Sequence, residues 1–153
     1  RRQEEAYSLK FTPSAFWALI LSSITLEDSV EFLGRIPLNE VSNVFNSFDI
    51  AVFPSLRESF GVAAVEAQAC GIPVIVTSVG GHPEVVINDK TGIIVESENS
   101  RQISDAILKL LNDENLRKSM SIEGRNFVKE NYEINLNFNA IEDIYKEILN
   151  IKK

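Results

Sequence analysis

The feature that most constrains the fold is an alternation of short apolar runs with segments of helical character, from Asp28 onward. Runs of this kind are typical of strands that are covered on both faces, as in a parallel sheet between helices. The expected strands are Val30–Leu33, Ile50–Phe53, Val74–Val76 and Ile93–Val95, and the helices expected between them are Pro37–Phe48, Val62–Ala69 and His82–Val86. This order predicts a doubly wound α/β domain.

The last third of the chain has a purely helical pattern. Apolar residues recur on one helix face at Ile103, Ala106, Ile107, Leu110 and Leu111. Two further helices are predicted around Leu116–Val128 and Ile141–Ile148. Because no strand separates them, these helices must pack on the sheet, on each other or on a further domain.

Residues 1–27 are poorly specified. A polar start, a Thr12-Pro13 break and an apolar segment around Phe16-Trp17 allow one helix to be predicted, over roughly Pro13–Ile24. We interpret 1–27 as a divergent start of the domain that occupies 28–153. The chain begins with Arg1, which indicates a piece of a longer protein.

Composition excludes several classes of function. The 153 residues carry a net charge of −7, which argues against binding nucleic acid or an anionic membrane surface. One Cys and one His are too few for an internal disulfide or a Cys/His zinc site, and we expect no metal. The most apolar stretch, Ala15–Leu21, is far shorter than the about 20 residues of a membrane span. We expect a cytoplasmic protein, at most peripheral to a membrane in its full-length form.

The most informative stretch runs from Pro54 to Glu66. It leaves a predicted central strand and enters a helix, and ligands of open α/β sheets bind outside the carboxyl ends of strands. The helix N-terminus offers unpaired N–H groups suited to phosphate, and Gly61 allows a ligand close to the backbone. Glu58 and Glu66 repel phosphate but accept hydrogen bonds from hydroxyls, so the pattern indicates a nucleotide sugar. Taken alone, Glu58 fits a solvated loop residue and Glu66 a surface helix residue better than they fit a binding site.

The motifs around this stretch resemble the donor-binding half of retaining glycosyltransferases of family 4, which have the GT-B fold. A Glu-x7-Glu pattern with Phe-Gly inside it spans Glu58–Glu66. The other matching blocks are Val30–Ile36, Ile50–Ser55, Gly71–Ile75, Val79–Val85 and Thr91-Gly92. The resemblance covers about residues 28–131. It implies a Rossmann-like parallel sheet flanked by helices.

The resemblance also implies roles. Glu58 matches the residue that contacts hydroxyls of the transferred sugar beside the reacting centre, and is the expected catalytic residue. Glu66 matches the ribose ligand. The remaining substrate-binding residues are Ser59, Phe60, Gly61 and Val62, in the loop whose N–H groups meet sugar and diphosphate, and Gly34, Arg35 and Ile36, in the turn against the base.

Three neighbouring features receive mainly structural interpretations. Gly80-Gly81 is predicted to form a turn with unusual backbone angles. His82 is the single histidine, but the family position varies in type, so a catalytic role is not favoured. Arg57 is interpreted as a solvated loop residue, with contact to a phosphate as the alternative.

The chain departs from the family in two respects. No acceptor domain and no clear Arg/Lys clamp for the diphosphate is found; Arg1, Arg2 and Lys10 are basic, but their surroundings do not match that block. We therefore predict the donor-binding domain of a transferase that needs no metal or other cofactor, uses a nucleoside-diphosphate sugar in glycan biosynthesis and is inactive without its missing acceptor domain. A non-catalytic binding or interaction domain of the same fold, and another GT-B enzyme such as an epimerase or phosphorylase, are the alternatives.

The final helix carries a separate prediction. In the family the C-terminal helix crosses back to the first domain. Without that partner, Ile144 and Ile148 would be exposed and would favour self-association.

Overall fold

The computed structural model describes residues 9–11 and 30–151. The chain divides into two compact units, Arg1–Val41 and Ser42–Lys153, which are described separately. The helix predicted over Pro13–Ile24 lies outside the described residues, as do Arg1 and Arg2.

In the first unit, β1 (Leu9–Phe11) pairs in parallel with β2 (Val30–Phe32), with Leu9 opposite Val30. The strand predicted over Val30–Leu33 is thus confirmed. The strand at Leu9–Phe11 was not predicted, because three residues that follow a polar segment carry no recognisable period.

The helix predicted over Pro37–Phe48 is broken into shorter pieces. A 3-10 turn at Leu38–Glu40 leads into α2 (Val41–Phe45) at the boundary between the units. The helix stops early because Ser47 bonds back to Val44 through both its backbone N–H, at 3.0 Å, and its hydroxyl, at 2.7 Å. Serine commonly competes with the helical ladder in this way.

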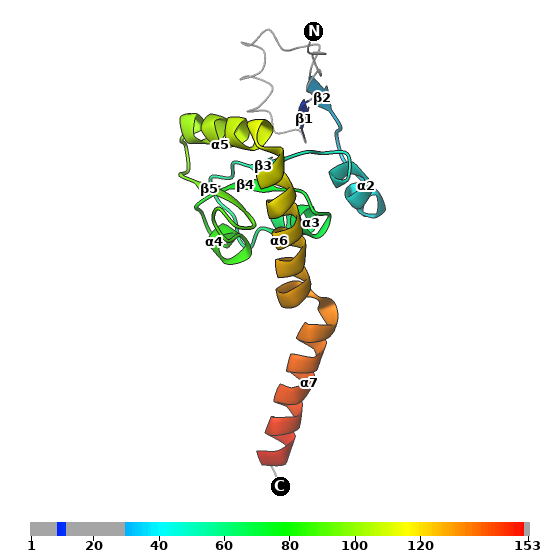
Figure 1. Ribbon diagram of the computed structural model, residues 1–153. Coiled ribbons are helices and arrows are strands. Elements are labelled where there is room, and N and C mark those ends of the chain that lie inside the picture. The colour runs from blue at the N-terminus through cyan, green and yellow to red at the C-terminus, as the bar shows by residue number, and fades with distance from the viewer. Residues whose placement is uncertain (1–8, 12–29, 152–153) are drawn as a thin grey trace, which may run out of the picture. The chain divides into compact units, whose positions relative to one another are not determined.

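The second unit is built on a parallel sheet of order β3-β4-β5, as Figure 1 shows. The strands are β3 (Ala51–Phe53), β4 (Val74–Thr77) and β5 (Gly92–Val95). The crossovers contain α3 (Val62–Ala69) and the short α4 (His82–Val85). The predicted strand–helix alternation is therefore confirmed, with the register Ala51 opposite Val74 and Val74 opposite Gly92.

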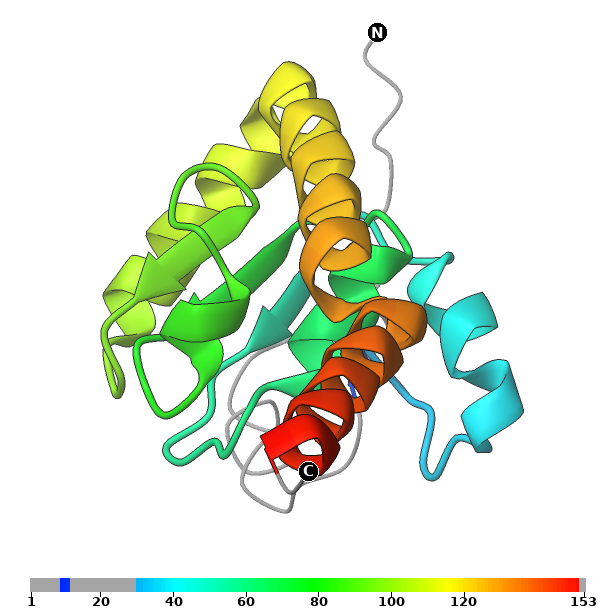
Figure 2. The same ribbon diagram turned by 90° about the horizontal axis from the view of Figure 1, so that it is seen from below.

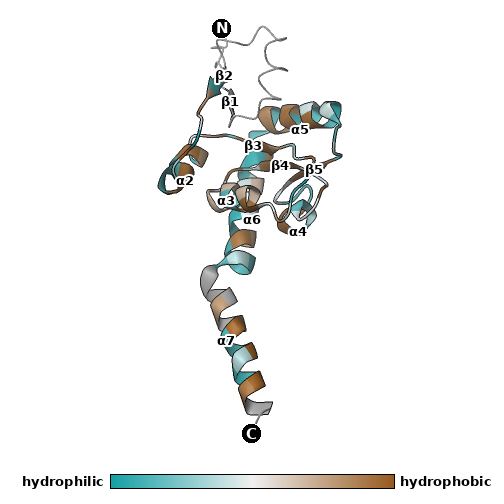
Figure 3. Cartoon of the chain, turned by 180° about the vertical axis from the view of Figure 1, so that it is seen from behind, coloured by the Kyte–Doolittle hydropathy of each residue, from teal (hydrophilic) through white to brown (hydrophobic). Residues whose placement is uncertain are grey.

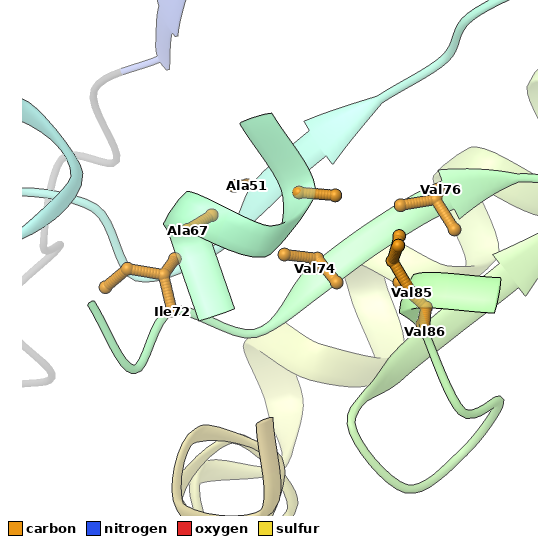
Figure 4. Close-up of a cluster of buried hydrophobic side chains, with 8 residues drawn as sticks. Ala51, Ala67, Ile72, Val74, Val76, Val85 and Val86 are labelled. Carbon is orange, nitrogen blue, oxygen red and sulfur yellow. The ribbon is translucent and has the colours of Figure 1, made fainter. Parts of the chain in front are cut away.

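The central strand β4 is buried on both faces. Val74 and Val76 point to one side, where they pack with Ala67 of α3 and with Val85 (Figure 4). Ile75 points to the other side, into a second cluster with residues of α5 and α6. Burial on both faces explains why β4 is apolar at successive positions.

Three helices complete the second unit: α5 (Ser100–Asn112), α6 (Glu114–Tyr132) and α7 (Ile134–Ile151). The side chains of Asn99 and Asp113 cap α5 and α6, accepting hydrogen bonds from the third residue after each of them. Helix α6 packs along α3, with α5 against the sheet (Figure 2). Arg125 of α6 donates to the Ala69 and Cys70 carbonyls at the end of α3, at 3.2 and 2.9 Å.

Helix α7 continues beyond the end of α6 and contains hydrophobic residues along its length (Figure 3). Several of its apolar side chains are exposed. The exposed set is Phe138, Ile141, Ile144, Tyr145, Ile148 and Leu149. The predicted exposure of Ile144 and Ile148 is confirmed, while self-association stays a prediction. Among the described helices, none combines the length and apolar character needed to cross a membrane.

Candidate functional site

The candidate site lies where β3 and β4 end. The loop after β3 carries residues 54–61 into α3, and the loop after β4 carries residues 78–81 into α4. Because both strands are parallel and adjacent, these loops emerge at the same edge of the sheet. This is the edge at which open α/β sheets bind ligands.

Two glycines bring the loops into direct backbone contact. A Cβ on Gly80 would lie 1.6 Å from the backbone oxygen of Glu58, and one on Gly81 would lie 2.5 Å from that of Phe60. Gly80 also has a φ of +52°, whereas Gly81 has an ordinary φ of −78°. The predicted unusual backbone angle is thus confirmed for Gly80 and wrong for Gly81. At Gly81 a side chain is excluded only because the backbone of Phe60 lies so close.

Glu58 is held by its own loop. Its Oε1 accepts hydrogen bonds from the backbone N–H of Ser59, at 3.0 Å, and of Gly61, at 3.2 Å. The side chain is 31% exposed, so the carboxylate is fixed but reachable. The N–H groups of Ser59 and Gly61, expected to meet a ligand, donate to Glu58 in this structure.

The start of α3 leaves other N–H groups available. Gly61, with a φ of +96°, precedes the helix and provides no side-chain cap, and its carbonyl accepts from Ala64 and Val65. Within the described part of the chain, no hydrogen bond uses the N–H of Val62 or Ala63. Val62 was among the residues predicted from the sequence and Ala63 was not, although its position in the first helical turn also leaves its N–H without a partner in the helix.

Glu66 lies one turn into α3, about 6 Å along the helix axis from Val62. Its side chain is half-buried. The described hydrogen bonds and ion pairs do not include its carboxylate. The two glutamates of the motif are therefore brought to the same helix end but to different depths along it.

His82 touches Glu58 and Gly61. It is only 1% exposed, its Nδ1 lies 2.9 Å from the Thr77 carbonyl oxygen, and its Nε2 lies 3.9 Å from Glu58 Oε2. A Cβ on Gly61 would lie 2.9 Å from the His82 ring. A catalytic role for His82 was not favoured from the sequence, because the family position varies in type. The spacing does not show which loop its ring faces.

Tyr132, at the end of α6, also reaches the site loop. Its ring packs edge-on against Phe60, with centroids 5.7 Å apart, and its hydroxyl donates to the Glu84 carbonyl at 3.1 Å. Partial burial, and secondarily the charge of Glu84, raise the pKa of Tyr132. This contact across 72 residues of sequence could not have been predicted from a local motif.

The predicted base-binding turn belongs to the first unit. Gly34 has a φ of +66° and open space around the position of a Cβ, Arg35 is exposed and Ile36 is half-buried. Arg57 is exposed in the loop after β3, as expected for a solvated residue. Lys10 lies in β1.

The described residues contain no cluster of three or more His, Cys, Asp or Glu side chains with the arrangement of a metal site. A surface hollow of about 350 Å³ lies at the opposite edge of the sheet, near Asp49, Pro73 and Arg117. The Arg117 guanidinium already donates to the carbonyls of Leu110 and Leu111 at the end of α5. That hollow is therefore separate from the two glutamates.

Comparison with known proteins identifies a family. The sequence profile of the family described as "Glycosyl transferases group 1" matches residues 19–127. The capsular polysaccharide biosynthesis glycosyltransferase CapM of Staphylococcus aureus is 33% identical over 143 residues. That match covers 86% of this chain but only 38% of CapM.

Solved structures give the same fold. The C-terminal domain of the group 1 glycosyltransferase LpcC from Francisella tularensis superposes with a TM-score of 0.70 at 33% identity, covering 76% of this chain and 60% of that one. Anabaena HepE, solved in complex with UDP-glucose, superposes with a TM-score of 0.77 at 21% identity, covering 86% and 36%. The structural neighbours are GT-B glycosyltransferases, so the predicted fold class is confirmed.

Proposed function

This chain belongs to the group 1 glycosyl transferases, and we propose that its second unit binds a nucleoside-diphosphate sugar as glycosyl donor. The observation that carries the proposal is the start of α3, where two backbone N–H groups without partners lie between two carboxylates at different depths. Helix N-termini favour phosphate, and carboxylates favour hydroxyls. HepE, a neighbour in fold, is described in complex with UDP-glucose, a donor of this class.

Each residue receives a role in this proposal. The N–H groups of Val62 and Ala63 face the diphosphate, Glu66 accepts hydrogen bonds from the ribose hydroxyls, and Glu58 accepts them from the transferred sugar. The loop from Ser59 to Gly61 lies against the sugar and diphosphate. We assign the base to the turn Gly34–Ile36 by resemblance to the family alone.

The reaction is a glycosyl transfer with retention. The bond between the anomeric carbon and the diphosphate oxygen breaks, and that oxygen takes the bonding electrons. The acceptor hydroxyl forms the new bond on the same face of the sugar and gives its proton to the departing diphosphate. This chain would contribute position and charge, with Glu58 beside the positive charge that develops on the sugar.

The complete activity needs more than this chain. The match covers 38% of CapM, and we propose that the acceptor site and the cations that clamp the diphosphate come from the remainder of a longer protein engaged in glycan biosynthesis. The isolated 153 residues should bind donor weakly and transfer no sugar. Robust transfer by the isolated chain would refute this part of the proposal. The predicted cytoplasmic location stays a prediction.

A thermal-shift panel tests donor binding. UDP, GDP and ADP are compared with their glucose and mannose conjugates, and a ligand of the folded state raises the melting temperature by mass action. We expect one nucleotide series to respond, and Glu66→Ala to abolish the response. Glu130→Ala, at an exposed position of α6, is the matched control. Equal shifts in wild type and Glu66→Ala would count against the ribose role.

The same panel tests the requirement for a metal. We propose that the donor is the only small molecule that the domain uses, with no metal or other cofactor. The shift should then be the same in EDTA and in Mg²⁺. A shift that needs Mg²⁺ would contradict this.

A further inference from the structure

We propose that His82 is a positioning residue for Glu58, holding the carboxylate in the orientation in which it meets the hydroxyls of the transferred sugar. The inference rests on the proposed function of Glu58. It concerns a residue that the Glu-x7-Glu motif does not contain.

The first observation is the fixed orientation of the imidazole. His82 is buried, and its Nδ1 lies 2.9 Å from the Thr77 carbonyl oxygen. A carbonyl oxygen only accepts hydrogen bonds, so Nδ1 carries a proton. Thr77 is the last residue of β4, and its hydroxyl donates to the Ser55 carbonyl at 2.7 Å. The ring is therefore anchored to the end of a buried strand.

The second observation is the direction in which the rest of the ring points. With Nδ1 engaged, Nε2 is the remaining polar atom, and it lies 3.9 Å from Glu58 Oε2. This distance is within ion-pair range and is too long for a direct hydrogen bond. At 3.9 Å the buried ring lies in contact with Oε2, so it limits how far the carboxylate can turn on that side.

The third observation is that the two oxygens of Glu58 have different partners. Oε1 accepts from the N–H groups of Ser59 and Gly61, whereas Oε2 faces His82. The backbone bonds alone would fix one oxygen and let the carboxylate rotate about that point. His82 supplies a second reference point, so the plane of the carboxylate is defined.

The glycines around His82 leave the ring little freedom. The ring lies so close to Gly61 that a Cβ there would meet its Cδ2 at 2.9 Å, and Gly80 and Gly81 press the turn before His82 onto the backbone of Glu58 and Phe60. A displaced imidazole would therefore displace the loop that carries Glu58. This arrangement favours a positioning role over simple filling of the core.

Nuclear magnetic resonance of the imidazole tests the contact without any ligand. The chain has one histidine, so ¹⁵N-histidine labelling yields the signals of His82 alone. We expect Nδ1 to be protonated and Glu58→Gln to move the Nε2 resonance. Glu66→Gln, which removes the other carboxylate of the motif, should leave that resonance in place. An Nε2 resonance that ignores Glu58→Gln would overturn the proposal.

Two substitutions test the consequence for donor binding. In His82→Asn, the side-chain amide can replace only the N–H donor at the position of Nδ1. In His82→Gln, the longer side chain brings the amide toward the position of Nε2. We expect His82→Asn to weaken UDP-glucose binding about fivefold with little change for UDP, and His82→Gln to restore part of the loss. Equal losses for both ligands would indicate a purely structural role and overturn the proposal.

The resonance experiment and the binding experiment distinguish failure of this inference from failure of the proposed function. If the wild-type chain bound neither UDP nor UDP-glucose, nor any other pair of the panel, donor binding by this chain would fail. The Nε2 response to Glu58→Gln would still decide whether His82 holds Glu58. Should the His82 variants fail to fold, the spectra of the labelled wild type and of Glu58→Gln decide the same question.

Discussion

The contact between the two site loops can be tested with three glycine-to-alanine substitutions in the second unit. Gly71→Ala introduces a side chain at a φ of +78°, but its Cβ meets only the movable ends of Ser121 and Arg125. Gly81→Ala has an ordinary φ, but its Cβ would lie 2.5 Å from a backbone oxygen. Gly80→Ala combines both problems, with a φ of +52° and a backbone oxygen at 1.6 Å.

The expected magnitudes follow from these differences. The left-handed backbone costs an L-residue about 1–2 kcal/mol, so Gly71→Ala should lower the free energy of unfolding by that amount. Overpacking costs about 1–3 kcal/mol, which is the expectation for Gly81→Ala. Gly80→Ala should then cost about 2–5 kcal/mol, close to the sum of the other two.

Urea unfolding followed by circular dichroism measures these values, with an unchanged m-value as evidence that the denatured state is the same. The decisive comparison is Gly81→Ala, because its cost comes only from the approach of the two loops. A loss below about 0.5 kcal/mol, the range of an ordinary surface substitution, would refute the conclusion that the turn after β4 packs tightly on the backbone of the first loop at Phe60.

Three further predictions concern the helices. Leu110→Ala removes a fully buried side chain of α5 and should lower the free energy of unfolding in urea by about 2–5 kcal/mol. Leu108→Ala, at an exposed position of the same helix, should lower it by less than about 0.5 kcal/mol. Similar losses for the two variants would contradict the burial of the helix face that contains Leu110. The pKa of Tyr132 is raised, so it contributes stability that is present below the ordinary tyrosine pKa and is lost as pH rises through the higher folded value. Tyr132→Phe should reduce this alkaline loss, and an unchanged alkaline limb of stability against pH would refute the assignment. Finally, we expect sedimentation to show association that depends on concentration and that Ile144→Asp and Ile148→Asp abolish; a strict monomer at high concentration would argue against self-association through α7.

The sequence predicted those parts of the fold in which the pattern of apolar residues directly reflects burial. The run Val74–Thr77 is buried on both faces and therefore contains only residues that tolerate such burial. The period of α5 appears in its apolar face for the same reason. The end of α2 depends instead on one serine, and β1 on pairing with a distant strand, so neither follows from local periodicity.

The same distinction applies to the candidate site: features within one segment could be predicted, and contacts between distant loops could not. The spacing of Glu58 and Glu66 indicated the helix end, because both residues belong to one continuous segment. The contacts of Glu58 with Gly80 and His82 join loops that are about 20 residues apart in sequence, and the pairing of β3 with β4 is what brings those loops together. A motif within one segment contains no information about such neighbours.

The position of Glu58 therefore depends on β4 as well as on the loop that contains it. The loop from Pro54 to Gly61 is irregular and partly exposed, whereas Thr77 and His82 are buried at the end of the central strand. The hydrogen bonds from Thr77 to Ser55 and from His82 to Thr77 connect that buried end to the loop. A substitution that shifts the end of β4 should consequently alter recognition of the transferred sugar before it alters recognition of the nucleotide, since Glu66 lies on α3 and has no described contact with these residues. The residue proposed to bind the sugar is therefore positioned from the buried strand β4, and the residue proposed to bind the nucleotide is positioned by helix α3.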